Sequence, residues 1–452
     1  MNRRAFCGGL LLVGLQSALT RPGSAKSVSF EHPAEQILDQ IVAEFPKQSF
    51  PAFPMGFEDN LQQIASLEVL EKQREWVLKS TRSMENVQVS GASEATQERW
   101  VATVNDLSFL ASWNWLSINH RKHPEEVSPS RGFGSRTAEE LKQLEDLSSK
   151  VDCVYLGHER WKGLVCLSEG ERWYDLYARF WTGALSAQHW DPVVLGQAEL
   201  RRISDELANH KQTLEAAQRR ITDESEVTRR LQEIDRQVRA KGFLVGEVPP
   251  VKLARMPADS PVQAPGFYRE GTFYFNMTGG FPERNLSWLY LHEAIPGHHY
   301  QSIQKLSSAP RLLSYPGLME GWGVYAEHLG DDFGFLQDPI QRIGWLLWDQ
   351  VRTARVVLDY RIHKEGWTRG QADNWWKENL PFHKDLARSE VDRVMRWPGQ
   401  SLSYKVGERE MLRIRANAKK RLGSNFDLKQ FHSKVLAREF SSWDELDTRL
   451  KG

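Results

Sequence analysis

The sequence has no surplus of charge of either sign and no long apolar run outside its N-terminus. Lys and Arg together number 59, and Asp and Glu together also number 59, in a chain of 452 residues. Binding nucleic acid without sequence preference needs an excess of basic residues, so this balance argues against that class. No stretch of about 18 apolar residues is present that could span a membrane. With 40% hydrophobic and 26% charged residues, the composition is that of a globular protein.

Cysteine is scarce, with three residues in all: Cys7, Cys153 and Cys166. No Cys-x-x-Cys spacing is present, which argues against a zinc site built from thiolates. Cys153 and Cys166 could close one disulfide in an exported chain, and the sequence leaves this pairing open.

The N-terminus carries the features of an export signal. Arg3 and Arg4 precede an apolar run over residues 7–15, and small residues follow at 23–25. Such an order is typical of cleaved signal peptides, and the paired arginines resemble the twin-arginine type. We therefore predict a signal peptide over residues 1–25 and a periplasmic or secreted mature protein. An ordinary signal for the general secretion route and an amphipathic start of a cytoplasmic protein are the alternatives.

Apolar residues recur at helical spacing through most of the mature chain, which predicts a mainly α fold. The stretch from Asp205 to Arg239 is so polar that it predicts an exposed helical hairpin. The predicted helical segments are Glu58–Met84, Glu94–His120, Thr137–Lys150, Glu171–Ser186 and Val194–Val238.

One short segment has the alternation of β-strands instead. Two aromatic runs within residues 266–276 flank Arg269-Glu270-Gly271, which predicts a β-hairpin. A proline-containing connection precedes it. We therefore divide the mature chain into a helical N-terminal region, residues 26–250, and a metal-binding catalytic region, residues 251–452.

Three histidines and a glutamate lie within eight residues, at His292, Glu293, His298 and His299. Neutral imidazoles and a carboxylate are the ligands that catalytic zinc sites use, and a glutamate beside the first histidine can act as general base on water. The sequence therefore predicts a zinc centre with His292 as a ligand and Glu293 as the base.

The identity of the second histidine ligand depends on how the helix breaks. Pro296 stands four residues after His292, where the common His-Glu-x-x-His pattern has its second ligand, and proline interrupts a helix. An unbroken helix would bring His299 over His292, whereas a compact bulge would present His298. We favour His298, because a bulge gives the geometry of an expanded His-Glu-x-x-His pattern.

A third ligand is predicted on a later helix. Glu320 and Glu327 are seven residues apart, so they share one helix face. Gly321 and Gly323 leave room for the backbone to approach a metal. We assign Glu320 as a ligand of one Zn²⁺ ion and Glu327 as a carboxylate that orients a histidine. Two solvated glutamates are the alternative.

Three motifs then stand out together. They are His-Glu-Ala-Ile-Pro-Gly-His-His at 292–299, Glu-Gly-Trp-Gly-x-Tyr-x-Glu at 320–327 and Pro-Gly-Gln-Ser-Leu-Ser-Tyr-Lys-x-Gly at 398–407. Together they resemble a bacterial family, the domain of unknown function 885. That family looks like a divergent branch of the zinc metallopeptidases with glutamate as third ligand, the gluzincins. The resemblance implies a large helical fold with a deep cleft and a small β-sheet beside the metal-binding helix.

Further candidates follow downstream. Arg355, Asp359 and His363 are each four residues apart and line one helix face. In a functional interpretation, Arg355 binds a substrate carboxylate and His363 donates to the oxyanion. Tyr404, in a glycine-flanked turn, is another candidate donor. Each could instead be a satisfied structural side chain.

The leading hypothesis is an exported zinc-dependent peptidase or amidase that acts on short peptides, with Glu293 moving a proton from water to the leaving amine. The strand over residues 273–276 could pair with an extended peptide, which makes Asn276 a substrate-binding candidate. Hydrolysis of a non-peptide amide or ester is one alternative. A non-catalytic periplasmic binding or scaffold protein is the other, and an intact Glu293 argues against it.

Overall fold

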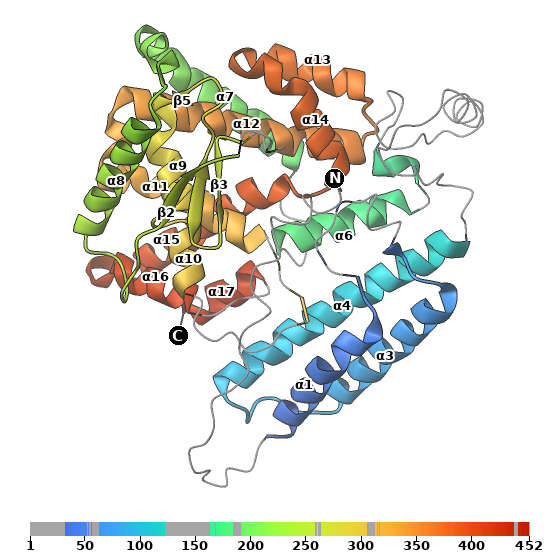
Figure 1. The fold of residues 1–452 in the computed structure, drawn as a ribbon. Helices are drawn as coiled ribbons and strands as arrows, with labels where there is room; N and C mark the ends of the chain where they lie inside the picture. Colours follow the sequence, from blue (N-terminus) through green and yellow to red (C-terminus); the bar gives the residue numbers. More distant parts are fainter. Residues whose placement is uncertain are drawn as a thin grey trace.

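The computed structural model describes most of the chain between residues 32 and 451 and is mainly α-helical, which confirms the mainly α part of the predicted fold (Figure 1). The predicted signal peptide, the predicted helix Thr137–Lys150 and the side chains of Cys153 and Cys166 lie outside the described residues. The residues not described are 1–31, 52, 54–55, 57–62, 123–162, 168, 184–190, 258–259, 261–263, 305–311, 314, 316, 438–441 and 452.

The first helices form a group at the lower right of Figure 1. Phe109 of α4 and Phe180 of α6 lie 5.2 Å apart between ring centroids, in a core rich in aromatic side chains. α3 begins after Ser66, whose hydroxyl accepts a hydrogen bond from the backbone N–H of Val69. The helices of this group are α1 (Pro33–Glu44), α3 (Leu67–Glu85), α4 (Glu94–Lys122) and α6 (Gly170–Thr182).

The predicted exposed helical hairpin is only partly correct. Two helices are present, α7 (Pro192–Asn209) and α8 (Glu224–Ala240), but the connection between them contains short 3₁₀ turns and the strand β1 (Arg220–Ile221). α8 also buries one face completely, with Val227, Leu231 and Val238 fully inaccessible to solvent. Apolar residues every three or four positions make α8 an amphipathic helix that packs on the core.

A three-stranded sheet contains the predicted hairpin. β3 (Gly266–Arg269) pairs antiparallel with β4 (Thr272–Phe275) through Glu270 and Gly271, which both have positive φ, as a two-residue hairpin turn requires. β2 (Lys252–Arg255) pairs parallel with the other side of β4. β4 is therefore the central strand and has no free edge for a peptide, which corrects the expectation for residues 273–276. β1 pairs separately with β5 (Phe281–Pro282).

The helices from α9 onward carry the residues of the predicted metal site. Their apolar core also includes Ile203, Leu231 and Phe243, so side chains from both sides of residue 250 contribute to it. Within the described ranges, no helix is long and apolar enough to cross a membrane. These helices are α9 (Leu286–Glu293), α10 (His298–Gln304), α11 (Gly317–Phe333), α12 (Pro339–His363), α13 (Arg369–Asn379), α14 (Ala387–Arg396), α15 (Leu402–Leu422), α16 (Leu428–Leu436) and α17 (Trp443–Arg449).

α11 and α15 cross with their backbones in direct contact. A Cβ atom on Gly407 would lie 2.3 Å from the Cα atom of Gly321, so the crossing is possible only because neither residue has a side chain. Glu320 directly precedes this crossing on α11, and Tyr404 lies about one turn before it on α15. The crossing therefore brings these two side chains towards the same place.

We predict that Gly407→Ala destabilises the protein by about 1–3 kcal/mol or more, because the added methyl group must push α11 and α15 apart. The measurement is the free energy of unfolding from urea titration. Gly370→Ala in α13 is the matched control, since no atom lies within 4 Å of the added Cβ. Equal stability of the Gly407 variant and the parent would contradict the crossing.

Candidate metal centre

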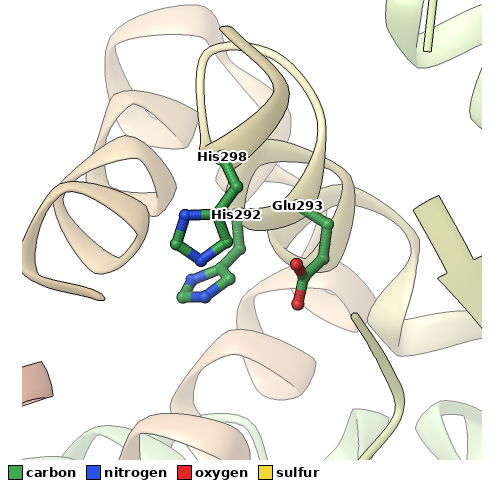
Figure 2. Close-up of side chains that lie close together, drawn as sticks. All are labelled: His292, Glu293 and His298. Carbon is green, nitrogen blue, oxygen red and sulfur yellow. The ribbon is translucent and has the colours of Figure 1, made fainter. Parts of the chain in front are cut away.

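The metal-binding motif is interrupted after Glu293, where α9 ends, and helix resumes at His298, where α10 begins. Gly297 lies in this break, and a Cβ atom there would be 1.8 Å from the carbonyl oxygen of His292. Because glycine allows this approach, the chain folds back tightly and sets His298 beside His292. Their ring centroids lie 4.8 Å apart with planes at 85°, and Figure 2 shows the carboxylate of Glu293 next to the two rings.

Glu320 of α11 brings a third candidate ligand atom close to both imidazoles. Its Oε2 atom lies 3.7 Å from Nε2 of His292 and 3.6 Å from Nε2 of His298. Ligand atoms at the usual bond lengths around a tetrahedral zinc ion are about 3.3–3.5 Å apart, so the two distances to Glu320 are close to those that such an ion requires. His299 points elsewhere, with Nε2 2.9 Å from the Pro249 carbonyl oxygen.

Glu293 is the other carboxylate near the two imidazoles, and it offers an oxygen within 4.8 Å of a ring nitrogen of each. Its Oε2 atom accepts a hydrogen bond of 2.8 Å from the backbone N–H of Tyr268 on β3. Burial raises the pKa of Glu293, although the neighbouring imidazoles oppose the shift. A carboxylate whose pKa is raised, held by a backbone amide, is suited to exchange a proton.

A buried chain of ionic hydrogen bonds fixes the other side of His292. Nδ1 of His292 lies 2.7 Å from Oε1 of Glu327, which is fully buried. Arg352 donates to both oxygens of Glu327, at 2.8 and 2.5 Å. With Nδ1 engaged, Nε2 of His292 is turned towards Glu320, as a ligand nitrogen must be.

The electrostatics of this pocket favour a positive charge. Burial alone would lower the pKa of His292, but its contacts with Glu320 and Glu327 outweigh burial and raise this pKa to about 9. Burial alone would raise the pKa of Glu320, yet His292 and His298 hold it well below its usual range. The same field that favours a protonated imidazole would favour a metal cation.

Tyr404 lies in the first turn of α15 rather than in a loop. Its hydroxyl oxygen accepts hydrogen bonds from Arg393 at 3.2 Å and from Gln400 at 3.3 Å. Burial and, next, the charge of Glu320 raise the pKa of Tyr404, so the phenol stays protonated and remains a donor.

A family described as "Bacterial protein of unknown function (DUF885)" matches residues 135–447, well over half of the chain. The chain belongs to this family. The match begins upstream of α6, so it includes part of the helical N-terminal region as well as the motifs of the site.

Two solved structures share the fold. A candidate lipoprotein from Colwellia psychrerythraea is 21% identical with a TM-score of 0.57, covering 92% of this chain and 73% of that chain. A candidate lipoprotein of unknown function from Shewanella oneidensis is 17% identical with a TM-score of 0.65, covering 94% and 100%. The apo-Mg carboxypeptidase of Pyrococcus furiosus aligns at 12% identity over 93% and 94%, but its TM-score of 0.42 is too low to indicate a shared fold. No curated protein matches the chain.

Two of the predicted substrate contacts are engaged within the DUF885 fold itself. Arg355 donates through Nε and Nη2 to both oxygens of Glu390, in a buried pair. The charge of Arg355 is therefore already paired with a carboxylate of the protein, and its contact with a substrate carboxylate stays a prediction. Asn276 follows the central strand, and its side chain bonds the backbone of Ala264 and Thr278.

The structure places the predicted oxyanion donor, His363, among backbone groups. It is fully buried at the end of α12, about 16 Å along the helix from Arg352 at about 1.5 Å per residue. One ring nitrogen lies 3.0 Å from the Val394 carbonyl oxygen, and the other accepts from the Leu164 N–H at 3.4 Å. The helical spacing correctly shows which face His363 lies on, but not what covers that face.

No role was predicted from the sequence for Arg352, Arg393 or Tyr268. Arg352 shares the helix face of Asp359, so its spacing marks it as inward-facing, but its partner Glu327 lies on a different helix. No local pattern marks Arg393 or the Tyr268 backbone. Both come close to the site only through tertiary packing.

We predict that His363 contributes to the pH dependence of stability rather than to turnover. Burial lowers its pKa to about 4, so the unfolded chain binds its proton first and stability falls as pH drops from about 6.5 to 4. His363→Gln can keep both backbone contacts but does not titrate. Between pH 7 and pH 5 the parent should lose about 2 kcal/mol more unfolding free energy than this variant.

Urea titrations at the two pH values measure that difference, and zinc content and kcat at pH 7 should be unchanged. Parallel loss of stability in parent and variant, or a large loss of kcat, would restore the functional interpretation of His363.

Proposed function

We propose that the chain is an exported zinc-dependent hydrolase, a metallopeptidase acting on short peptides. The observation that carries this proposal is the triangle of His292, His298 and Glu320, with ligand atoms 3.6 and 3.7 Å from the shared carboxylate oxygen and Glu293 alongside. The side chains of His298 and Glu320 keep 13% and 21% of their surface exposed, so solvent reaches this side of the site.

A zinc ion held there would polarise a scissile carbonyl and acidify an attacking water. Glu293 keeps one oxygen on the Tyr268 N–H and has the other available to accept the proton of that water. Its raised pKa then favours holding this proton until the leaving amine takes it. A purely structural metal site needs ligands but has no use for such a base, which favours an enzyme over a scaffold.

A peptide substrate is supported by the edge strand β3. Its register with β4 leaves the backbone groups of Gly266 and Tyr268 on the outer edge. This edge runs past Glu293, to which the Tyr268 N–H already donates. An extended peptide that added a strand here would pass beside the general base, and a backbone ladder would bind many sequences without selecting side chains.

Glu293→Gln should lose at least about 10²–10⁴-fold in kcat while it still binds one zinc ion, because the amide keeps the shape but cannot accept a proton. The measurements are zinc content by mass spectrometry, melting temperature, and hydrolysis of a mixed tripeptide library with and without chelator. Zinc-dependent hydrolysis at the parent rate would contradict the mechanism.

Ligand variants form the control for this experiment. His298→Ala and Glu320→Gln should each lose zinc together with activity, whereas His299→Ala should keep zinc because its ring bonds the Pro249 carbonyl. If Glu293→Gln also lost zinc while Glu320→Gln kept it, Glu293 would be the zinc ligand and Glu320 the general base.

Export through the twin-arginine route is supported by Arg3, Arg4 and the apolar run that follows. Replacing both arginines by lysine should retain the chain in the cytoplasm, measured by fractionation of the native host. Undiminished export of the double variant would point to the general secretion route instead.

A further inference from the structure

Arg393 on α14 is a cation whose contacts are neutral. Its guanidinium donates to Oε1 of Gln400, at 3.4 Å from Nε and 3.2 Å from Nη2, and to the hydroxyl of Tyr404. Among the described residues, no carboxylate forms an ion pair with it. The nearby Glu390 has both oxygens bonded to Arg355, so it interacts with Arg393 through its charge but forms no hydrogen bond with it.

Two groups of this cluster remain able to donate a hydrogen bond. Nη1 of Arg393 donates to none of the described residues, and the side chain is only partly buried. The hydroxyl oxygen of Tyr404 accepts from both Arg393 and Gln400, so its own hydrogen has no acceptor in the described part of the chain. The cluster therefore presents donors and positive charge, with no anion of its own.

This cluster lies next to the proposed metal ligands. The contact of Gly407 with Gly321 brings the first turn of α15 against the start of α11, where Glu320 stands. The charge of Glu320 also reaches Tyr404 strongly enough to be the largest influence on its pKa after burial. Tyr404 thus stands between the triangle of ligands and Arg393.

We propose that Arg393, Gln400 and Tyr404 form a subsite for a free carboxylate of the substrate. Nη1 of Arg393 and the hydroxyl of Tyr404 could both donate to one carboxylate, and the hydrogen bond from the charged guanidinium would be the stronger of the two. The inference rests on the proposed function and narrows it. The substrates are peptides or N-acylated amino acids whose free carboxylate lies close to the bond that is cut.

The test compares two equimolar libraries of N-acetylated tripeptides, one with a free C-terminal carboxylate and one amidated. The zinc-loaded parent should cleave the free acids at least about tenfold faster, since charge-assisted contacts are made only with them. Arg393→Gln should lower kcat/KM for the acids by about 10- to 150-fold and leave the amides within about twofold, as expected for loss of a charged hydrogen bond. Product formation is followed by mass spectrometry.

Arg388→Gln, an exposed arginine on the same helix, is the matched control and should change neither rate. Arg393→Lys keeps the positive charge but lacks the several N–H donors of a guanidinium. It should retain part of the preference for free acids over amides. Equal cleavage of both libraries by the parent would overturn the proposal. An equal loss on both libraries in Arg393→Gln would also overturn it, because Arg393 would then only position Tyr404.

A binding measurement distinguishes failure of the proposed hydrolase function from failure of the proposed carboxylate subsite. If the parent cleaves neither library, equilibrium dialysis of both libraries against zinc-loaded Glu293→Gln protein decides the question. Retention of the acids at least about tenfold over the amides, abolished by adding Arg393→Gln, supports the subsite without turnover. Lack of that preference overturns it.

Discussion

The position of the site depends on one buried ionic contact, between Arg352 of α12 and Glu327 of α11. Both side chains are almost completely buried, at 1% and 0% exposure, so neither charge could be tolerated without the other. Removing one partner of such a pair typically destabilises a protein by about 3–5 kcal/mol. Because Glu327 also holds Nδ1 of His292, the pair locks the relative positions of α9, α11 and α12 and the direction of the first imidazole. A second ionic contact, partly buried, joins Asp349 and Lys405 at 2.7 Å and ties α12 to α15.

Close backbone contacts make this ionic interior possible. The crossing of α11 and α15 at glycine brings the charged side chain of Glu320 towards Tyr404. Gly323 serves His292 directly, since a Cβ atom there would lie 2.7 Å from Cε1 of the ring. Gly297 does the same for the backbone of His292 in the break between α9 and α10. The tight folding of the motif is therefore a steric requirement, and it explains why the site needs glycine at positions that contribute no chemistry.

Elements that depend on residue spacing within a short segment were predicted from the sequence. Contacts between segments far apart in the chain were not. Helical periodicity located α4 and α6, and a Gly-containing turn between aromatic runs located the β3–β4 hairpin, because these signals lie within a few residues of each other. The same spacing put Arg355 and His363 on an inward face but could not show their partners. The partner of Arg355 is Glu390 and the partner of His363 is the carbonyl of Val394. Both partners lie on α14, more than thirty residues after the residue that they contact. β2 was also missed, since a four-residue strand in a proline-containing connection is recognisable only by its pairing with β4.

Asp359 shows how distant elements determine the positions of Gln400 and Tyr404. Both of its oxygens accept from the backbone N–H of Gly399, at 3.0 and 3.1 Å, at the start of the turn that leads into α15. Gly399 has a φ of 76°, and a Cβ atom there would lie 2.8 Å from the backbone nitrogen of Ala178 on α6. The turn is thus clamped between α12 and α6, and with it the positions of Gln400 and Tyr404. A helix of the N-terminal region therefore helps set the geometry around the proposed zinc ligands, although it contributes none of them.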